Sequence, residues 1–131
     1  METYAFKDLR DWVNKPRRKP LLLRGARQVG KTWLIDELAN QEFNNYLKID
    51  FEESPGFRSL FDGELDPQLI CSELEIRTGV DIEAKKTLLF FDEIQACKPA
   101  LSSLRFFYEK RPGLHLIAAG SLLEFALQEI P

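Results

Sequence analysis

The chain of 131 residues is poor in the residue types that mark secreted, membrane-spanning or zinc-binding proteins. Its two cysteines, Cys71 and Cys97, form no C-x-x-C pair, and with the single histidine, His115, they cannot supply the four ligands of a typical zinc site. No apolar run approaches the roughly 20 residues that span a bilayer. The first eight residues lack the apolar core of a secretory signal. We therefore expect a reduced, cytoplasmic setting and no membrane partner.

The composition is that of one folded domain. Hydrophobic residues make up 44% of the sequence and charged residues 30%, which excludes the composition of a disordered chain. The length falls within the roughly 100–200 residues of a single domain. We expect one domain over residues 1–131.

Charge is distributed unevenly, although the formal net charge of the whole chain is only −3. Residues 1–31 hold nine Lys/Arg against three Asp/Glu, a balance of +6, and the rest hold nine against eighteen, a balance of −9. This asymmetry indicates an anionic ligand near the N-terminal third. The basic run at residues 15–20 could contact nucleic acid. The run contains two prolines and no aromatic residue, a composition more typical of a solvated loop. The acidic net charge of the whole chain gives a nucleic-acid role no support.

Segments typical of strands alternate with segments typical of helices along the chain. Apolar runs predict buried strands at residues 21–23, 46–51, 87–91 and 114–119. Helical spacing and Pro/Gly signals predict helices at residues 5–13, 30–40, 67–78, 99–111 and 122–129, with a turn-rich stretch at 54–56. This alternation indicates an α/β fold with a mostly parallel sheet, in which ligands bind at the carboxyl ends of the strands.

The segment directly after the first predicted strand matches the pattern G-x-x-x-x-G-K-[ST]. Its residues are Gly25, Ala26, Arg27, Gln28, Val29, Gly30, Lys31 and Thr32. The glycines let consecutive backbone N–H groups curl around a phosphate, and the start of the following helix favours its negative charge. Lys31 is expected to reach the β- and γ-phosphates, and the Thr32 hydroxyl to bind Mg²⁺. The motif predicts a nucleotide phosphate site.

Two carboxylates, Asp92 and Glu93, follow the third predicted strand, about sixty residues after the phosphate motif. At that place Asp92 is expected to hold Mg²⁺ through water, and Glu93 to act as general base or to orient the attacking water. An acidic pair after a strand is otherwise a solvated strand end or a helix cap; behind a phosphate loop it predicts a catalytic pair. Neither D-x-x-G nor N-K-x-D occurs in the chain, which disfavours a GTPase and favours an adenine nucleotide.

Ser121 follows the fourth predicted strand and has two interpretations. If that strand lies between the first and the third, its hydroxyl could contact the γ-phosphate or the attacking water. It could equally be the N-cap of the helix predicted at residues 122–129.

These residues together resemble the AAA-type ATPases of the additional-strand P-loop class, and most closely a group of bacterial and archaeal ATPases of largely unknown role. The resemblance rests on residues 24–32, 91–95 and 117–123 and covers the chain from about residue 6 to its end. It implies a three-layer P-loop NTPase fold with strand order 5-1-4-3-2. It also implies Walker A roles for Lys31 and Thr32, Walker B roles for Asp92 and Glu93, and a sensor-1 role for Ser121.

Proteins of this group resemble longer chains that continue into a fifth strand, a helical lid and a further domain. From that resemblance we expect this sequence to be an N-terminal fragment of the ATPase domain, with the fifth strand, the sensor-2 residue and the arginine finger lying beyond it. Arg105 and Arg111 have no motif that would make either one a finger.

Three functions remain open on the sequence. The first is an ATPase that binds ATP and Mg²⁺ and hydrolyses the nucleotide to drive a conformational change. The second is a nucleotide-responsive binding module with little hydrolysis. The third, a P-loop metabolite kinase, is disfavoured because no Arg-rich lid segment is evident after the third strand. A homo-oligomer and a protein partner of unknown identity are compatible with these functions.

The remaining notable residues are interpreted as structural. Trp33 is expected to pack in the core rather than to stack on adenine, and His115 to be a core histidine. The aromatic cluster at residues 106–108 is expected to form core and a partner-facing surface. Glu52 and Glu53 are expected in a solvated loop.

Overall fold

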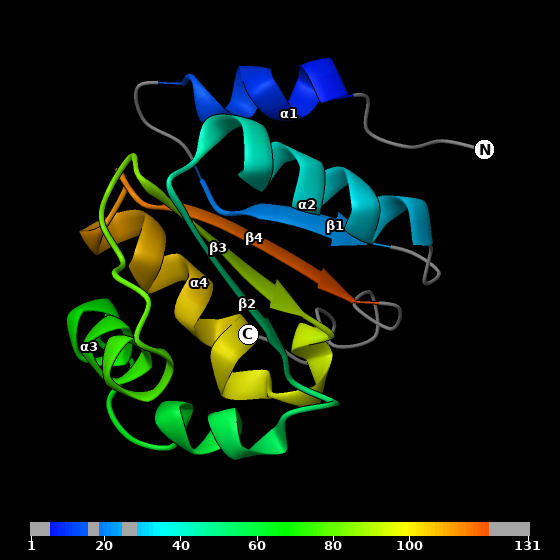
Figure 1. The fold of residues 1–131 in the computed structure, drawn as a ribbon. Helices are drawn as coiled ribbons and strands as arrows, with labels where there is room; N and C mark the ends of the chain where they lie inside the picture. Colours follow the sequence, from blue (N-terminus) through cyan, green and yellow to red (C-terminus); the bar gives the residue numbers. More distant parts are fainter. Residues whose placement is uncertain (1–5, 16–18, 25–28, 121–131) are drawn as a thin grey trace.

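The computed structural model describes residues 6–15, 19–24 and 29–120, and it has a parallel sheet between two layers of helices (Figure 1). The helices are α1 (Phe6–Val13), α2 (Val29–Glu42), α3 (Pro67–Thr78) and α4 (Lys98–Lys110), with two 3₁₀ helices, η1 (Pro55–Phe61) and η2 (Ile94–Ala96). The strands are β1 (Leu21–Arg24), β2 (Asn45–Asp50), β3 (Thr87–Asp92) and β4 (His115–Gly120). The predicted α/β class is confirmed.

The four strands lie in the order β1-β4-β3-β2, and every neighbouring pair is parallel. This order agrees with the 1-4-3-2 part of the order that the resemblance implies. The register aligns the carboxyl ends of the strands: Arg24 pairs with Gly120, and Asp92 pairs with both Ala119 and Asp50. Residues far apart in the sequence therefore meet at one edge of the sheet.

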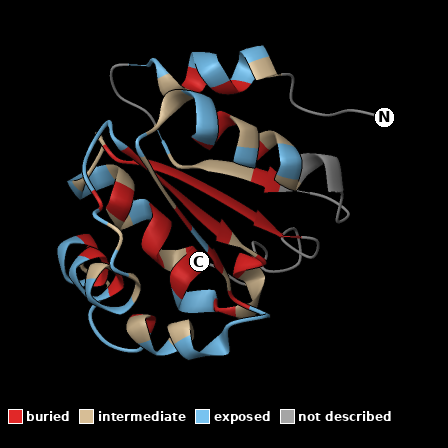
Figure 2. Cartoon of the chain, viewed as in Figure 1, coloured by how far each residue is buried: buried red, intermediate tan, exposed pale blue. Residues whose placement is uncertain are grey.

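Successive side chains of the central strands enter opposite cores, because side chains alternate across a strand. Phe90 and Ile117 belong to the apolar cluster covered by α1 and α2, whereas Phe91 and Ala118 belong to the cluster that includes α3 and α4. Figure 2 shows β3 and β4 buried along their length. Burial on both faces explains why these strands are nearly continuous apolar runs.

The edge strand β1 departs from the predicted burial on both faces. Leu23 is buried, but Leu21 and Leu22 are only half-buried. Within the described residues β1 has a single neighbour, β4, which leaves its other edge without a covering strand.

The helix ends follow the local signals in the sequence. The Asp66 carboxylate caps α3 by accepting a hydrogen bond from the backbone N–H of Gln68 at 3.0 Å, and Pro67 occupies the first turn. Gly79 ends this helix in the left-handed conformation, with φ of 75°. Helix α4 ends at Lys110, one residue before the end of the helix predicted at residues 99–111.

Two local predictions need correction. The stretch expected to be a turn around residues 54–56 opens the 3₁₀ helix η1, which buries Phe61 in the core. On α4, helical spacing in the sequence predicts Leu101, Leu104 and Tyr108 on the inner face, but the inner face carries Phe107, and Tyr108 is half-buried. The helical phase places residues 100, 104 and 107 on one face, so Tyr108 lies at its border.

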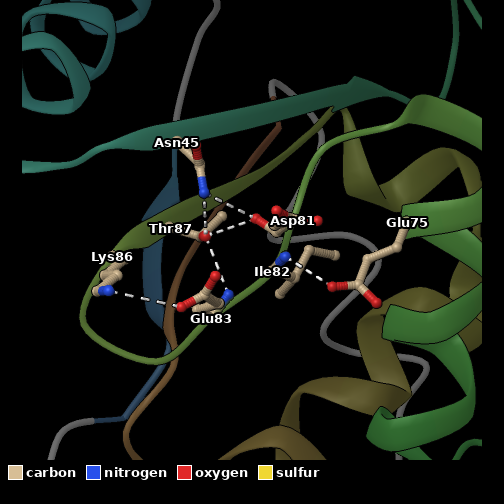
Figure 3. A network of polar contacts seen from close by, with 7 residues as sticks. All are labelled: Asn45, Glu75, Asp81, Ile82, Glu83, Lys86 and Thr87. Carbon is tan, nitrogen blue, oxygen red and sulfur yellow. Dashed lines mark hydrogen bonds and ion pairs between the residues drawn. The ribbon is translucent and has the colours of Figure 1, made fainter.

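At the amino ends of β2 and β3, away from the strand ends described above, a polar network anchors the loop before β3 (Figure 3). The buried Thr87 hydroxyl donates to the Asp81 carbonyl at 2.7 Å and accepts from the Glu83 N–H at 3.0 Å. The Asn45 amide also donates to the Asp81 carbonyl, at 3.2 Å. The Glu75 carboxylate of α3 accepts from the Ile82 N–H at 2.8 Å. The network therefore joins two strands, a loop and a helix.

None of the described helices has the length and apolar character needed to cross a bilayer.

Candidate functional site

The candidate site lies at the sheet edge where the strands have their carboxyl ends, toward which the arrowheads of β1, β3 and β4 point in Figure 1. Across this edge Arg24 is paired with Gly120, Ala119 with Asp92, and Asp92 with Asp50. In open parallel sheets ligands bind outside this edge, where the loops that follow the strands come together.

The predicted phosphate motif begins directly after β1 and runs into α2. Gly25, Ala26, Arg27 and Gln28 lie outside the described residues. The backbone of Val29, Gly30, Lys31 and Thr32 forms the first turn of α2. The predicted strand before the motif and the predicted helix at its end are thus present, and the N-terminus of a helix carries partial positive charge suited to an anion. The phosphate contacts themselves stay a prediction.

Asp92 is the last residue of β3, and its carboxylate is half-buried at the sheet edge. Its Oδ1 accepts a hydrogen bond from the backbone N–H of Glu93 at 2.9 Å, which orients the group. Burial raises the pKa of Asp92, and the nearby charges of Asp50 and Glu93 raise it further, against the lowering effect of that hydrogen bond and of Lys48. Ionisation of Asp92 is therefore less favourable in the folded protein than in an exposed aspartate.

Asp50 is a site neighbour that the sequence reasoning missed. It is the last residue of β2 and the register partner of Asp92. Its Oδ1 accepts from the backbone N–H groups of Glu52 at 2.9 Å and Glu53 at 3.0 Å, which fixes the turn after the strand. The available signal was its position one residue before the end of the strand predicted at residues 46–51. The pairing of β2 with β3 could not be predicted from a local sequence pattern. Glu52 and Glu53 are exposed, as expected.

Glu93 directly follows β3 and is buried, with 5% of its surface exposed. Its backbone is left-handed, with φ of 50° and ψ of 47°, an uncommon conformation for a residue other than glycine. Its Oε1 accepts a hydrogen bond from Nε2 of Gln95 at 2.8 Å. Asp92 and Glu93 are thus both held at the end of a central strand, as predicted, while their catalytic roles stay predictions.

A cluster of aromatic rings supports the end of β3. The ring of Phe91, directly before Asp92, contacts Phe51, Phe61 and Phe107 edge-to-face, with centroid distances of 5.5, 5.9 and 6.2 Å. All four rings are buried. Close packing of this kind restricts motion of the backbone that carries the two carboxylates.

The donor set fits Mg²⁺ held together with phosphate and water. The Asp92 carboxylate and the Thr32 hydroxyl are hard oxygen ligands of the kind this ion prefers. The repulsion and burial that raise the pKa of Asp92 are relieved by a divalent cation. Within the described part of the chain no group of three or more His, Cys, Asp or Glu residues could hold a metal ion.

Of the residues that the sequence led us to interpret as structural, His115 is placed as predicted and Trp33 is not. The prediction that Trp33 packs in the core is wrong, because 59% of its surface is exposed. His115 is a core histidine, as predicted: it is buried, contacts the rings of Trp12 and Phe43, and lies 2.9 Å from the Val13 carbonyl through Nε2. Ser121 lies outside the described residues, as does the helix predicted after it.

The structure also describes the two cysteines, the aromatic cluster at residues 106–108 and part of the basic run at residues 15–20. Both cysteines are free and buried thiols. In the cluster at residues 106–108, Phe107 is core and its neighbours are half-buried. The basic run at residues 15–20 is described only in part, and Lys19 lies over the ring of Tyr108 at 5.6 Å. A nucleic-acid role is not tested by these contacts.

The sequence of the chain matches a known family of domains. A family model described as AAA domain matches residues 17–131. A comparison with curated proteins finds none that matches the chain. The matched segment contains the four described strands, the phosphate motif and both carboxylates at the end of β3.

Proposed function

Because the chain belongs to the AAA domain family, we propose that it binds Mg-ATP at the carboxyl edge of the sheet and hydrolyses it to drive a conformational change. Family membership supports nucleotide binding and, more generally, ATPase activity. The observation that carries the proposal is the position of Asp92 and Glu93 at the end of β3, separated only by β4 from the strand that leads into the phosphate motif.

Each group has a distinct role in the proposed reaction. The backbone N–H groups of residues 25–32 and the Lys31 ammonium bind the phosphates, and Thr32 and Asp92 hold the metal ion. Bound Mg²⁺ supplies charge neutralisation at the phosphates. Glu93 accepts a proton from water, whose oxygen bonds to the γ-phosphorus while the bond from that phosphorus to the β–γ bridging oxygen breaks. Ser121 is proposed to contact the γ-phosphate or this water.

A nucleotide-responsive binding module with little hydrolysis is the alternative. The observation that favours it is the burial of Glu93, which has only 5% of its surface exposed. A buried carboxylate is less accessible to a water molecule. The two functions share the binding site and differ only in turnover.

One experiment with two variants tests the proposal. We expect Lys31→Ala to weaken Mg-ATP binding by at least about tenfold, because a charged contact to phosphate is lost. We expect Glu93→Gln to retain binding and to lose turnover by about a hundredfold or more. Binding is measured by calorimetry and turnover by phosphate release.

Exposed residues of α4 provide matched controls, namely Lys110→Ala and Glu109→Gln. Both should behave as the wild-type protein. Unchanged ATP affinity in Lys31→Ala would reject the phosphate site, and persistent turnover in Glu93→Gln would remove Glu93 from the mechanism. Binding without turnover in the wild-type protein would favour the alternative function.

The proposal also includes a homo-oligomer, a protein partner of unknown identity and a cytoplasmic location. Three large apolar side chains, Trp33, Leu69 and Ile76, are exposed on α2 and α3. Size-exclusion chromatography with light scattering, with and without nucleotide, measures whether subunits associate.

A further inference from the structure

The Glu93 carboxylate is oriented by a neighbour two residues further along the chain. Gln95 lies within η2, and its Nε2 donates to Oε1 of Glu93 at 2.8 Å. Only this orientation of the amide places a donor toward the carboxylate, because an ionised carboxylate is an acceptor only. The amide oxygen of Gln95 consequently points away from Glu93.

That amide oxygen lies against the end of β4. A Cβ atom built on Gly120 would overlap Oε1 of Gln95, so the amide occupies space that only glycine leaves open. Gly120 is the last residue of β4 and the register partner of Arg24. The Gln95 side chain therefore bridges the end of β4 and the carboxylate that follows β3.

Two features of this arrangement lower the stability of the folded protein. Oε1 of Gln95 is inaccessible to solvent and has no hydrogen-bond partner within the described residues. Glu93 is buried and its backbone is left-handed, without the freedom that glycine would have. Buried polar atoms without partners and strained backbones are concentrated at functional sites, where geometry is maintained against stability.

We propose that Gln95 is a positioning residue for hydrolysis, which holds the Glu93 carboxylate in place through Nε2 and is itself seated against Gly120. The proposal rests on the proposed role of Glu93 as the base. Gln95 acts through Glu93 and needs no contact with the nucleotide. It therefore contributes to the rate of the chemical step and not to nucleotide affinity.

The test uses Gln95→Met, which keeps the length and volume of the side chain and removes the amide donor. We expect kcat for ATP hydrolysis to fall about tenfold, the effect of losing a hydrogen bond to a charged group. KM and the dissociation constant for Mg-ATP should stay within about twofold of wild type. The melting temperature should not fall, since the variant also removes the buried amide oxygen that lacks a partner.

The matched control is Gln68→Met, at an exposed position of α3, which should match wild type in every measurement. Wild-type kcat in Gln95→Met overturns the role of Gln95 while leaving the proposed ATPase intact. A rise in KM and dissociation constant that parallels the fall in kcat also overturns it, since that pattern indicates general damage to the site. A wild-type protein that binds Mg-ATP without turnover overturns the proposed hydrolysis, and this proposal with it.

A double-mutant cycle tests the link to Gly120. Gly120→Ala places a methyl group where the Gln95 amide oxygen lies, so it should lower kcat about as much as Gln95→Met does. In a Gln95→Ala background the methyl group has space, and Gly120→Ala should have no further effect. Additive losses in the double variant would show that Gly120 acts independently of Gln95.

Discussion

Asp92 carries the clearest electrostatic feature among the single residues of the site. Burial and the charges of Asp50 and Glu93 raise its pKa. A carboxyl group whose pKa is raised by folding binds its proton more tightly in the folded protein than in the unfolded chain. Its ionised form therefore destabilises the fold at neutral pH, and this penalty disappears as pH falls to the ordinary aspartate value of about 3.9.

From this sign we predict that Asp92→Asn stabilises the nucleotide-free protein at pH 7. Asparagine retains an acceptor for the Glu93 N–H and carries no charge. Because Asp92 is only half-buried, solvent screening keeps the gain small, about 0.5 kcal/mol. Urea denaturation at a series of pH values measures it, and the gain should shrink between pH 7 and about pH 4.

The exposed Asp62 provides the control, since Asp62→Asn removes a charge outside the site. It should not reproduce the gain of Asp92→Asn. A lower stability of Asp92→Asn at pH 7 would contradict the electrostatic interpretation. In the same variant we expect Mg²⁺-dependent nucleotide binding to weaken, because an amide oxygen is a poorer ligand for Mg²⁺ than a carboxylate.

At the scale of elements, the two ends of the sheet carry different groups of polar residues. The carboxyl ends of the strands carry the charged groups of the site, whereas the amino ends of β2 and β3 carry the polar network of Figure 3. In that network Thr87 is fully buried, and its hydroxyl makes one hydrogen bond as donor and one as acceptor with the loop before β3. The network stabilises this loop without contributing to the site.

We predict that Thr87→Val lowers the free energy of unfolding by about 1–3 kcal/mol, because two hydrogen bonds of the buried hydroxyl, to the Asp81 carbonyl and from the Glu83 N–H, are lost. Hydrogen exchange at the Glu83 amide should accelerate. Nucleotide affinity should be unchanged, since the network lies at the other end of the strands.

Thr87→Ser is the matched variant, because it keeps the hydroxyl group and removes only a methyl group. Protection of the Glu83 amide should survive in Thr87→Ser and be lost in Thr87→Val. Equal protection in both variants would show that the hydroxyl does not hold the loop.

At the scale of the whole molecule, the sheet separates two apolar cores that the site connects. Trp12 belongs to the core under α1 and α2, and Phe107 to the core under α4. The proposed ligand groups are linked to both cores: Thr32 lies in the first turn of α2, and Asp92 directly follows Phe91, whose ring packs against Phe107. A bound nucleotide should therefore stabilise the fold as one unit.

We predict that Mg-ATP at about a hundred times its dissociation constant adds about 2.7 kcal/mol to the free energy of unfolding, which corresponds to a rise of about 10 °C in Tm. The fluorescence of the buried Trp12 reports the transition. In Lys31→Ala, whose affinity is expected to be at least about tenfold weaker, the same ligand concentration should add at most about 1.4 kcal/mol, so the rise in Tm should be about half as large or less. A rise of equal size in Lys31→Ala would indicate that the nucleotide stabilises the protein from another place.

Local patterns in the sequence determined most of the fold and part of the site. The strands and the helix caps at Asp66 and Gly79 were predictable because they depend on neighbouring residues. The same holds for the placement of Asp92 and Glu93 at the end of a buried strand. Each of these features requires only the side-chain period and the turn chemistry of a short segment.

Tertiary structure alone decided which distant residues meet. Asp50 lies beside Asp92 because β2 pairs with β3, and Gln95 lies against Gly120 because β4 enters the sheet beside β3. The exposure of Trp33 depends on which face of α2 packs on the sheet. Short-range periodicity assigns residues to a face, but strand order and packing between layers determine what that face touches.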